Sequence, residues 1–443
     1  MTRTMKDSGV EWIGEVPEQW ILAKLKYNCS GFQNGSSQTQ LNSDISNYPV
    51  TRIETISTGK IDFDKVGYVE NINNNYLLKK NDFLISNINS IANLGNNAIF
   101  DSDRPLYHGM NLLKITPKFV YPKFLYYYFN SGIFRTNMQI LCKPAINQAS
   151  VSASNIKNIK MPLPPLPEQQ AIANYLDEKC AQIDNITATI NEQIEVLKQY
   201  KKSVITEAVT KGLDPNVPMK DSGVEWIGQI PEHWNIEKFK YDFTFSKGLQ
   251  ITKADLTEEG CPVISYGQIH SKINNSVSVN FKLIRFVDDS YQEDKNAITQ
   301  YGDIIWADTS EDYDGIGNSI FIDSNKNIFA GYHTIITRPL FDKLTKYFAY
   351  LFQTDIWRLQ LRKQATGIKV FSITQKMLKN SSILIPPLSE QQAIADYLDD
   401  KCAQIDAVVA DKQAQLETLA AYKKSLIYEY VTGKKSVPGF EEA

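Results

Sequence analysis

Two long stretches of the chain repeat apolar residues in alternating steps of four and three, the spacing that a coiled coil requires. Each begins with an acidic turn after a Pro-Pro pair, near Glu168 and Glu390, and each continues without Gly or Pro to Gly212 or Gly433. We therefore expect two helices of about 43 residues, roughly 60 to 65 Å long. The expected seam comprises Leu176, Ile183, Ile190, Ile194, Leu197 and Val204, then Leu398, Ile405, Val409, Leu416, Leu419 and Leu426.

An amphipathic helix of this length needs a partner for its apolar stripe, and the other copy in the same chain is the obvious one. We expect an intramolecular antiparallel coiled coil, which would place the two intervening regions at opposite ends of a rod. Lys201, Lys412 and Lys423 interrupt the seam, and we interpret them as residues that extend along the apolar surface or fix the register. Cys180 and Cys402 occupy equivalent seam positions and are expected to be buried thiols.

The helices belong to a larger internal repeat. The decapeptide MKDSGVEWIG occurs at 5–14 and again at 219–228, and the helix start PPLPEQQAIANYLDEKCAQID at 164–184 returns as PPLSEQQAIADYLDDKCAQID at 386–406. Between these matched ends the two halves barely resemble each other. We call the repeated segments the frame and the dissimilar regions between them the variable regions. This arrangement is expected when the frame performs one task twice and the variable regions recognise two different things.

The repeat predicts an α+β fold with pseudo-two-fold symmetry, in which two β-rich variable domains are separated by the two helices. The expected segments are a first variable domain with an N-terminal strap (1–163), a central helix (164–212), a second variable domain with the repeated strap (213–385), and a C-terminal helix and tail (386–443). We expect the straps to pack each variable domain against the helices. Their aromatic and proline residues are Trp12, Pro17 and Trp20 in the first copy and Trp226, Pro231 and Trp234 in the second.

Both variable regions contain a short apolar strand, then a polar loop, then another strand. Polar side chains on such a loop can read base edges, because amides pair with adenine, hydroxyls serve either way and acids accept from cytosine. The alternative is an ordinary solvated loop. The candidate DNA contacts are Asn87, Asn89, Ser90, Asn93, Asn96 and Asn97 in the first loop, and Thr309, Ser310, Glu311 and Tyr313 in the second.

The net charge of −3 averages over an uneven distribution, because the acidic excess lies mainly in the two helical segments. Residues 116–167 contain no Asp or Glu and several Lys and Arg residues, with aromatic neighbours at Tyr126, Tyr127, Tyr128 and Phe134. Such a stretch is typical of a surface that follows phosphates, and a solvated lysine-bearing face is the equal alternative. The basic candidates for DNA contact are Lys143, Lys157, Lys160, Lys247, Lys253 and Lys369.

Several classes of protein are disfavoured. The composition, 42% hydrophobic and 22% charged, is ordinary for a globular chain, and no run approaches the ~18 apolar residues of a membrane span. No secretory signal is visible, so we expect a cytoplasmic location. The five Cys show no zinc or redox spacing, and no phosphate-binding loop, dinucleotide fingerprint or amino-methyltransferase motif is present, so no catalytic residue and no metal ligand is assigned.

These features together resemble the specificity subunit of type I restriction-modification systems. The resemblance is carried by KDSGVEWIGEVPEQW and its second copy, by the doubled helix start, by GDII at 302–305 with its variant NDFLI at 81–85, and by TGIKVFSIT at 366–374. It implies two target recognition domains that each read one half of a bipartite DNA site, and a coiled coil that fixes the spacer. At 144–148 the first region reads PAINQ where the second has TGIKV, so a contact assigned to Lys369 does not transfer.

The resemblance also implies partners and cofactors. Two modification subunits would carry adenine methylation and restriction subunits would cleave DNA, so S-adenosylmethionine, ATP and Mg are expected only on those partners. Two other functions stay open: an enzyme that acts alone, which the missing motifs disfavour, and a coiled-coil scaffold whose variable domains bind protein, which the acid in the second domain keeps in consideration. Salt-dependent DNA binding would separate the reader from the scaffold.

Overall fold

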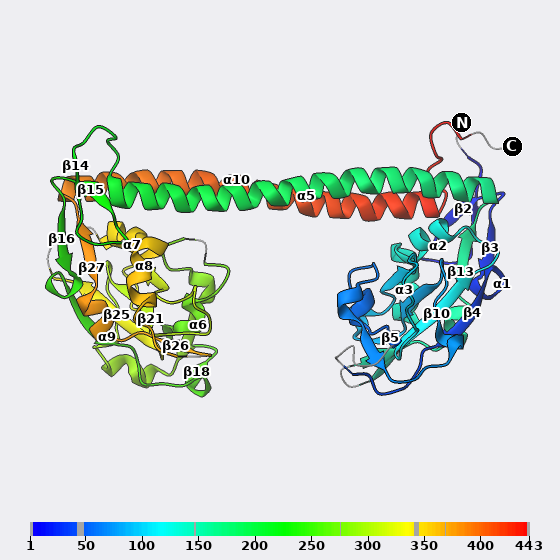
Figure 1. Ribbon diagram of the computed structural model, residues 1–443, viewed down its shortest axis with the longest axis horizontal. Coiled ribbons are helices and arrows are strands. Elements are labelled where there is room, and N and C mark those ends of the chain that lie inside the picture. Colours follow the sequence, from blue (N-terminus) through cyan, green and yellow to red (C-terminus); the bar gives the residue numbers. More distant parts are fainter. Residues whose placement is uncertain are drawn as a thin grey trace. The chain divides into compact units, whose positions relative to one another are not determined.

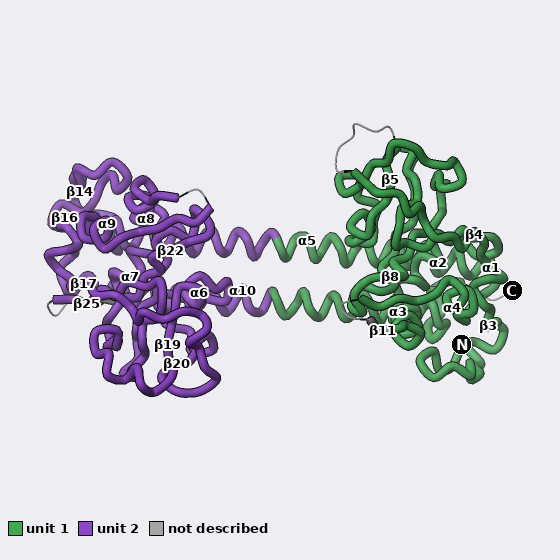
Figure 2. The backbone as a smooth tube through the Cα atoms, turned by 90° about the horizontal axis from the view of Figure 1, so that it is seen from below, with its two compact units in different colours: residues 1–191, 413–443 green, residues 192–412 purple. Residues whose placement is uncertain are grey.

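The computed structural model describes residues 3–41, 48–145, 148–274, 276–340, 345–367 and 369–440. The chain forms two compact units, residues 1–191 with 413–443 and residues 192–412 (Figure 2). Each long helix contributes to both units, so this division cuts across the segments of the sequence repeat. No helix within the described ranges is long and apolar enough to cross a membrane.

The two long helices are α5 (Leu166–Lys211) and α10 (Leu388–Val431) (Figure 1). Gly212 and Gly433 lie at their C-terminal ends with φ of 77° and 71°, the left-handed conformation that commonly ends a helix. The expected seam residues are buried or half-buried along both helices. Cys180 and Cys402 are also buried, and burial raises the pKa of both thiols.

The helices run antiparallel within each unit, and the seam lysines bond to the facing helix. In the first unit Lys423 Nζ lies 2.6 Å from Asp184 Oδ1, and in the second Lys201 Nζ lies 2.7 Å from Asp406 Oδ2. In the sequence repeat Lys201 corresponds to Lys423 and Asp184 corresponds to Asp406. The two pairs are therefore equivalent, with the lysine on α5 in one and on α10 in the other. Lys412 Nζ donates to Gln193 Oε1 at 2.6 Å. Pairs at equivalent positions fit one antiparallel register.

Each variable domain is built on a four-stranded antiparallel sheet, and the strand order is the same in both units. The order is β4 (Cys29–Asn34), β10 (Leu112–Pro117), β7 (Phe83–Ser86) and β9 (Asn97–Ile99) in the first unit, and β17 (Phe243–Lys247), β25 (Thr334–Pro339), β21 (Ile304–Ala307) and β23 (Ser319–Phe321) in the second. A helix pair follows, α2 (Pro122–Phe129) with α3 (Gly132–Ile140) or α7 (Thr345–Gln353) with α8 (Asp355–Arg362). The sequences of these regions barely match, yet their topology does.

The chain then returns to the long helices through equivalent elements. A short helix, α4 (Ala153–Lys157) or α9 (Gln375–Asn380), leads into β13 (Lys160–Leu163) or β27 (Ser382–Ile385). That strand pairs with the one after the strap, β3 (Ile21–Lys24) or β16 (Asn235–Lys238). In the first unit β3 leads into α1 (Leu25–Asn28). Both ends of each variable domain are thus held at the frame.

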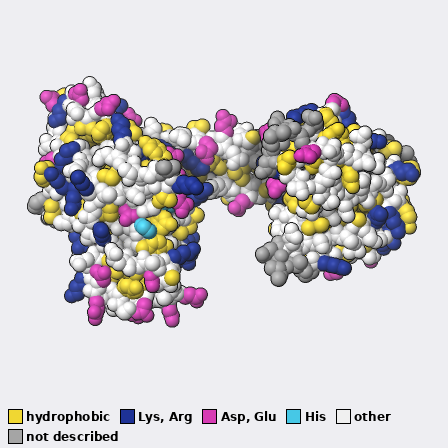
Figure 3. Space-filling model, turned by 60° about the horizontal axis from the view of Figure 1, so that its bottom comes forward, with side chains coloured by type: hydrophobic (Ala, Val, Ile, Leu, Met, Phe, Trp, Pro, Cys, Tyr) yellow, Lys and Arg dark blue, Asp and Glu magenta, His cyan; other side chains and the backbone are white. Residues whose placement is uncertain are grey.

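The remaining segments differ between the domains. The first has the pair β5 (Tyr48–Val50) and β6 (Gly67–Val69), whereas the second has α6 (Tyr266–Ile269) and a sheet of β18 (Leu256–Thr257), β20 (Arg285–Val287), β19 (Cys261–Ile264) and β24 (Phe329–Ala330). Exposed acids flank this sheet at Glu258, Glu259, Asp288, Asp289 and Glu293. Figure 3 shows acidic side chains gathered at the lower tip of the second unit. Such a surface disfavours contact with phosphates.

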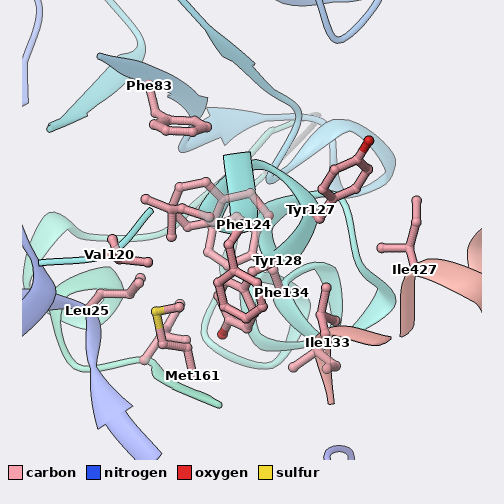
Figure 4. Packing of buried hydrophobic residues seen from close by; sticks show 14 of the residues in the cluster. Leu25, Phe83, Val120, Phe124, Tyr127, Tyr128, Ile133, Phe134, Met161 and Ile427 are labelled. Atoms are coloured by element: carbon pink, nitrogen blue, oxygen red, sulfur yellow. The ribbon is translucent and has the colours of Figure 1, made fainter. Parts of the chain in front are cut away.

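The core of the first unit joins its sheet, its helix pair and both long helices. Phe83, Phe124, Tyr128 and Phe134 pack in its interior, and Ile427 of α10 belongs to the same cluster (Figure 4). This corrects the interpretation of the aromatic residues in the acid-free stretch. Tyr127, Tyr128 and Phe134 are buried and Tyr126 is half-buried, because α2 and α3 turn their aromatic faces toward the sheet and α5. These rings are core residues and do not form a stacking surface for bases.

Candidate nucleic-acid interface

Each variable domain contacts the long helices through the same polar contacts. Asp177 of α5 accepts from Lys123 Nζ and, at 2.7 Å, from Tyr127 Oη. Asp399 of α10 accepts from Lys346 Nζ at 2.6 Å and from Tyr350 Oη at 2.8 Å. Burial, followed by the bond to the carboxylate, raises the pKa of both tyrosines, so the phenols are donors at neutral pH. Sequence analysis missed these contacts, although a Lys-x-x-x-Tyr spacing occurs in both regions.

The straps connect the helix ends to the variable domains. Each folds as a small hairpin, β1 (Met5–Asp7) with β2 (Glu15–Pro17) or β14 (Met219–Asp221) with β15 (Gln229–Pro231). Trp20 Nε1 donates to Glu168 at the start of α5, and Trp234 Nε1 donates to Glu390 at the start of α10, both at 2.9 Å. The ring of Trp20 also lies against Gly433 and that of Trp234 against Gly212.

Each strap therefore holds the start of one long helix beside the end of the other. The indoles of Trp20 and Trp234 are fully buried, and Trp12 and Trp226 are half-buried. These tryptophans have the packing role predicted from the sequence. Identical strap sequences are explained by the identical helix ends that they contact.

The strand before each polar loop is preceded by an Asn-Asp or a Gly-Asp pair, and the first residue of the pair has an unusual backbone conformation. Asn81 and Gly302 occupy the same position and have φ of 71° and 93°, a region open to Gly and tolerated by Asn. The following aspartates are buried: Asp82 accepts from Thr116 Oγ1 at 2.6 Å, and Asp303 pairs with Arg338 at 2.7 Å. The shared Gly/Asn-Asp pair is thus a turn that starts the central strand.

The polar loops occupy the same place in both domains, between β7 and β9 or between β21 and β23. Each begins with a short strand, β8 (Ile88–Asn89) or β22 (Thr309–Ser310), which pairs with the segment after the helix pair, β12 (Gln148–Ser150) or β26 (Phe371–Ser372). In the first domain β11 (Lys143–Ala145) extends this small sheet. Lys143 thus lies in the same small sheet as the first loop, separated from β8 by β12, and Lys369 lies in the turn before β26, the strand that pairs with the second loop.

The side chains of the first loop have different environments. Ser90 and Asn93 are exposed and bonded to each other at 3.1 Å, and Asn89 is half-buried against Ser86. Two predicted contacts need correction. Asn87 and Asn97 are buried, and their amides donate to Val151 O and to Phe129 O, so they support the loop from inside.

In the second loop Glu311 and Tyr313 are exposed, and Thr309 is half-buried with its hydroxyl 2.7 Å from Asp308 Oδ1. Ser310 needs the same correction as the two buried amides of the first loop. It is buried and donates to Asp312 O at 2.7 Å, because β22 turns it inward.

The other predicted lysines lie on different elements. Lys157 of α4 lies over the Phe32 ring at 5.6 Å, and Lys160 begins β13. Lys247 ends β17 opposite Ile335, and Lys253 begins a short 3-10 helix. Ile146 and Asn147 of the divergent PAINQ segment, and Ile368 of TGIKV, lie outside the described residues. Among the residues that the structure describes, no group of three or more His, Cys, Asp or Glu could hold a metal ion.

Comparisons with known proteins agree with this architecture. The model of the type I restriction modification DNA specificity domain matches the chain twice, at residues 26–196 and 231–418. A putative type I restriction enzyme MjaX specificity subunit of Methanocaldococcus jannaschii is 33% identical over 95% of both chains. The EcoKI specificity subunit of Escherichia coli strain K12 is 22% identical over 89% of this chain and 84% of its own. The chain therefore belongs to the family of type I restriction-modification specificity subunits.

Two solved structures share the fold at low sequence identity. A chain from a study of complex assembly and conformational transition of the type I restriction-modification system superposes with a TM-score of 0.71 at 16% identity, covering 95% of this chain and 99% of that one. The HsdS subunit from Thermoanaerobacter tengcongensis superposes with a TM-score of 0.53 at 16% identity, covering 97% and 100%. The predicted fold class, two β-rich domains with a coiled coil of two long helices and an internal repeat, is confirmed.

Proposed function

We propose that this chain is the DNA-reading subunit of a type I restriction-modification complex, and that each variable domain recognises one half of a bipartite double-stranded site. One observation carries the proposal: two domains with the same topology present polar loops of different sequence at the same place. A shared scaffold fixes where a loop lies, and the side chains on the loop specify the base pairs. Two readers of different half-sites need this combination.

The proposed recognition domains are residues 1–163 and 213–385, and the helical segments are 164–212 and 386–443. The proposed base contacts are the exposed loop residues Ser90, Asn93, Glu311 and Tyr313, together with the exposed Lys143 and Lys369. A low basic charge is compatible with this assignment, because partner subunits can supply contacts to phosphates.

We further propose that the coiled coil sets the spacer between the half-sites and docks two modification subunits, which restriction subunits join in the full complex. The 46 residues of α5 correspond to about 70 Å of helix. Two tethered readers bind more tightly than either alone only when the spacing of the half-sites matches the tether. The proposal places methylation, cleavage, S-adenosylmethionine, ATP and Mg on the partners and leaves recognition to this chain.

The test is to co-express the chain with its modification subunit in a host without DNA methylation and to map modified adenines by single-molecule sequencing. We expect a split motif with a fixed spacer. Replacing residues 21–160 with another variable domain should change one half-site only. A stable complex that methylates no site would contradict the proposal and favour a scaffold whose variable domains bind protein.

The spacer is tested separately by inserting one heptad after Thr187, which preserves the heptad phase of α5. A longer spacer in the methylated motif is the expected result. An unchanged spacer would show that the coiled coil does not set it.

A further inference from the structure

Both polar loops end in the same backbone turn. Leu94-Gly95-Asn96 closes the first loop and Ile316-Gly317-Asn318 closes the second, and the two glycines have φ of 81° and 82°. A Cβ on Gly95 would lie 3.2 Å from Met138 Cγ, and one on Gly317 would lie 3.2 Å from Leu361 Cδ1. The second helix of each helix pair, α3 or α8, therefore packs directly over the end of the loop.

That same helix supplies an arginine to the asparagine of the turn. In the first domain Arg135 Nη2 donates to Asn96 Oδ1 at 3.0 Å, and its Nη1 donates to Ala92 O inside the loop at 3.1 Å. In the second domain Arg358 Nη1 donates to Asn318 Oδ1 at 2.6 Å. The two domains differ in sequence but hold the loop end by the same pair of residue types.

Arg358 is a cation in the protein interior. It is 7% exposed, its Nε donates to Phe352 O and its Nη2 donates to Gln353 Oε1. Burial, together with repulsion from Arg362, lowers its pKa to about 10, so the guanidinium is still charged at neutral pH. A buried charge is costly unless it is hydrogen-bonded. The three acceptors of Arg358 must therefore stay in place, which fixes the geometry around the guanidinium.

The geometry that Arg358 maintains extends into the loop. A guanidinium only donates, so Asn318 must turn its Oδ1 toward Arg358 and its Nδ2 toward His270 Nδ1, which lies 3.0 Å away. His270 Nδ1 then accepts, and His270 Nε2 carries the hydrogen that bonds to Thr309 O at 2.8 Å. This chain of bonds connects Arg358 on α8 with β22 at the start of the loop.

We propose that Arg135 and Arg358 are positioning residues for DNA recognition, each setting the conformation of the loop in its own domain and thereby the discrimination at one half-site. This inference rests on the proposed function. Hydrogen bonds to base edges depend on direction, and a recognition site must be held within about 0.5 Å of its productive geometry. A loop released from its arginine would still meet DNA, but it would select base pairs poorly.

The test uses the full chain in complex with its modification subunit and a set of duplexes in which each recognised base pair is replaced in turn. Arg135→Lys and Arg358→Lys keep the charge and remove the forked donors. Each substitution should reduce discrimination by about tenfold or more at one half-site only, and the two should affect different half-sites. The salt dependence of binding should stay unchanged, because the number of charges is unchanged.

Matched controls are Arg104→Lys in the first domain, which replaces an arginine stacked on Phe63, and Arg285→Lys in the second, which replaces an exposed arginine of β20. Both should leave discrimination as it is. If Arg358→Lys fails to fold, His270→Phe decides the second domain, because it interrupts the bond chain to Thr309 and leaves Arg358 in place. Loss of discrimination at that half-site alone is again expected.

Two results would overturn the inference. Uniform weakening on every duplex, with discrimination between base pairs unchanged, would identify Arg135 as a phosphate contact. Unchanged discrimination in a folded variant would show that the arginines only stabilise the fold. Failure of the proposed function looks different, because the wild-type complex itself would then bind all duplexes equally.

Discussion

The two variable domains hold equivalent loops in different ways. In the first, an exposed arginine, Arg135, bonds directly to the loop backbone, and the loop is rich in asparagine. In the second, the buried Arg358 acts through Asn318 and His270, and the loop carries acids. What the domains share is the turn before the central strand and, at the end of the loop, the glycine and the arginine. The residues between these points differ, so the constraint acts on backbone geometry more than on loop sequence.

The largest expected difference between the domains concerns the two arginines. Arg358→Met should destabilise the second unit by about 3 kcal/mol, because it leaves one buried and two half-buried acceptors without their donor. Arg135→Met should cost about 1 kcal/mol or less, since water can replace an exposed donor. Hydrogen exchange of each unit in the full chain measures both values. Equal losses would show that burial does not distinguish the two contacts.

A second difference should appear on acidification. The buried His108 of the first unit donates from Nε2 to Leu112 O at 3.0 Å, and burial, followed by the charge of Lys114, lowers its pKa to about 4. Between pH 6.5 and 4 the unfolded chain binds this proton more readily than the folded chain. The stabilisation is therefore complete above pH 6.5 and is lost as the pH falls, by about 3 kcal/mol at pH 4.

The measurement is the free energy of unfolding of the first unit against pH, followed by hydrogen exchange. His108→Gln keeps a donor for Leu112 O and should flatten the profile. A variant profile as steep as that of the wild type would show that another group causes the acid sensitivity.

Sequence patterns predicted the frame better than the loops. The heptad spacing identified α5 and α10 because it is local and sustained over many turns. The common topology of the variable domains was not visible, because their strands are short and pair with distant segments. The polar loops were found from their composition, but composition cannot tell that Asn87, Asn97 and Ser310 turn inward. The arginine contacts were missed because they join a loop to a helix some forty residues away in both domains.

The contacts between variable domain and helix should be alike in the two units. Asp177→Asn and Asp399→Asn remove a charge that faces a lysine and a tyrosine, and each carboxylate is 36% exposed. We expect each to cost about 1 kcal/mol, because partly exposed ion pairs are weak and the tyrosine bond is retained in part by the amide. Protection of α2 and α7 amides from hydrogen exchange measures the loss. A much larger effect in one unit would show that the contacts of Asp177 and Asp399 are not equivalent.

The smallest expected difference lies in the coiled coil, where the reciprocal ion pairs occupy equivalent positions with different exposure. The side chains of Lys201 and Asp406 are 16% and 33% exposed, and those of Lys423 and Asp184 are 31% and 63% exposed. A more exposed pair is screened more strongly by water and salt, so Lys423→Met should change stability by about 0.5 kcal/mol or less and Lys201→Met by about 1 kcal/mol. Urea unfolding at low and high salt compares the two variants, with Lys202→Met on the exposed face of α5 as the control. If both seam variants are instead more stable than the wild type, the lysines are retained for register alone, because methionine fills the seam better than a paired ammonium.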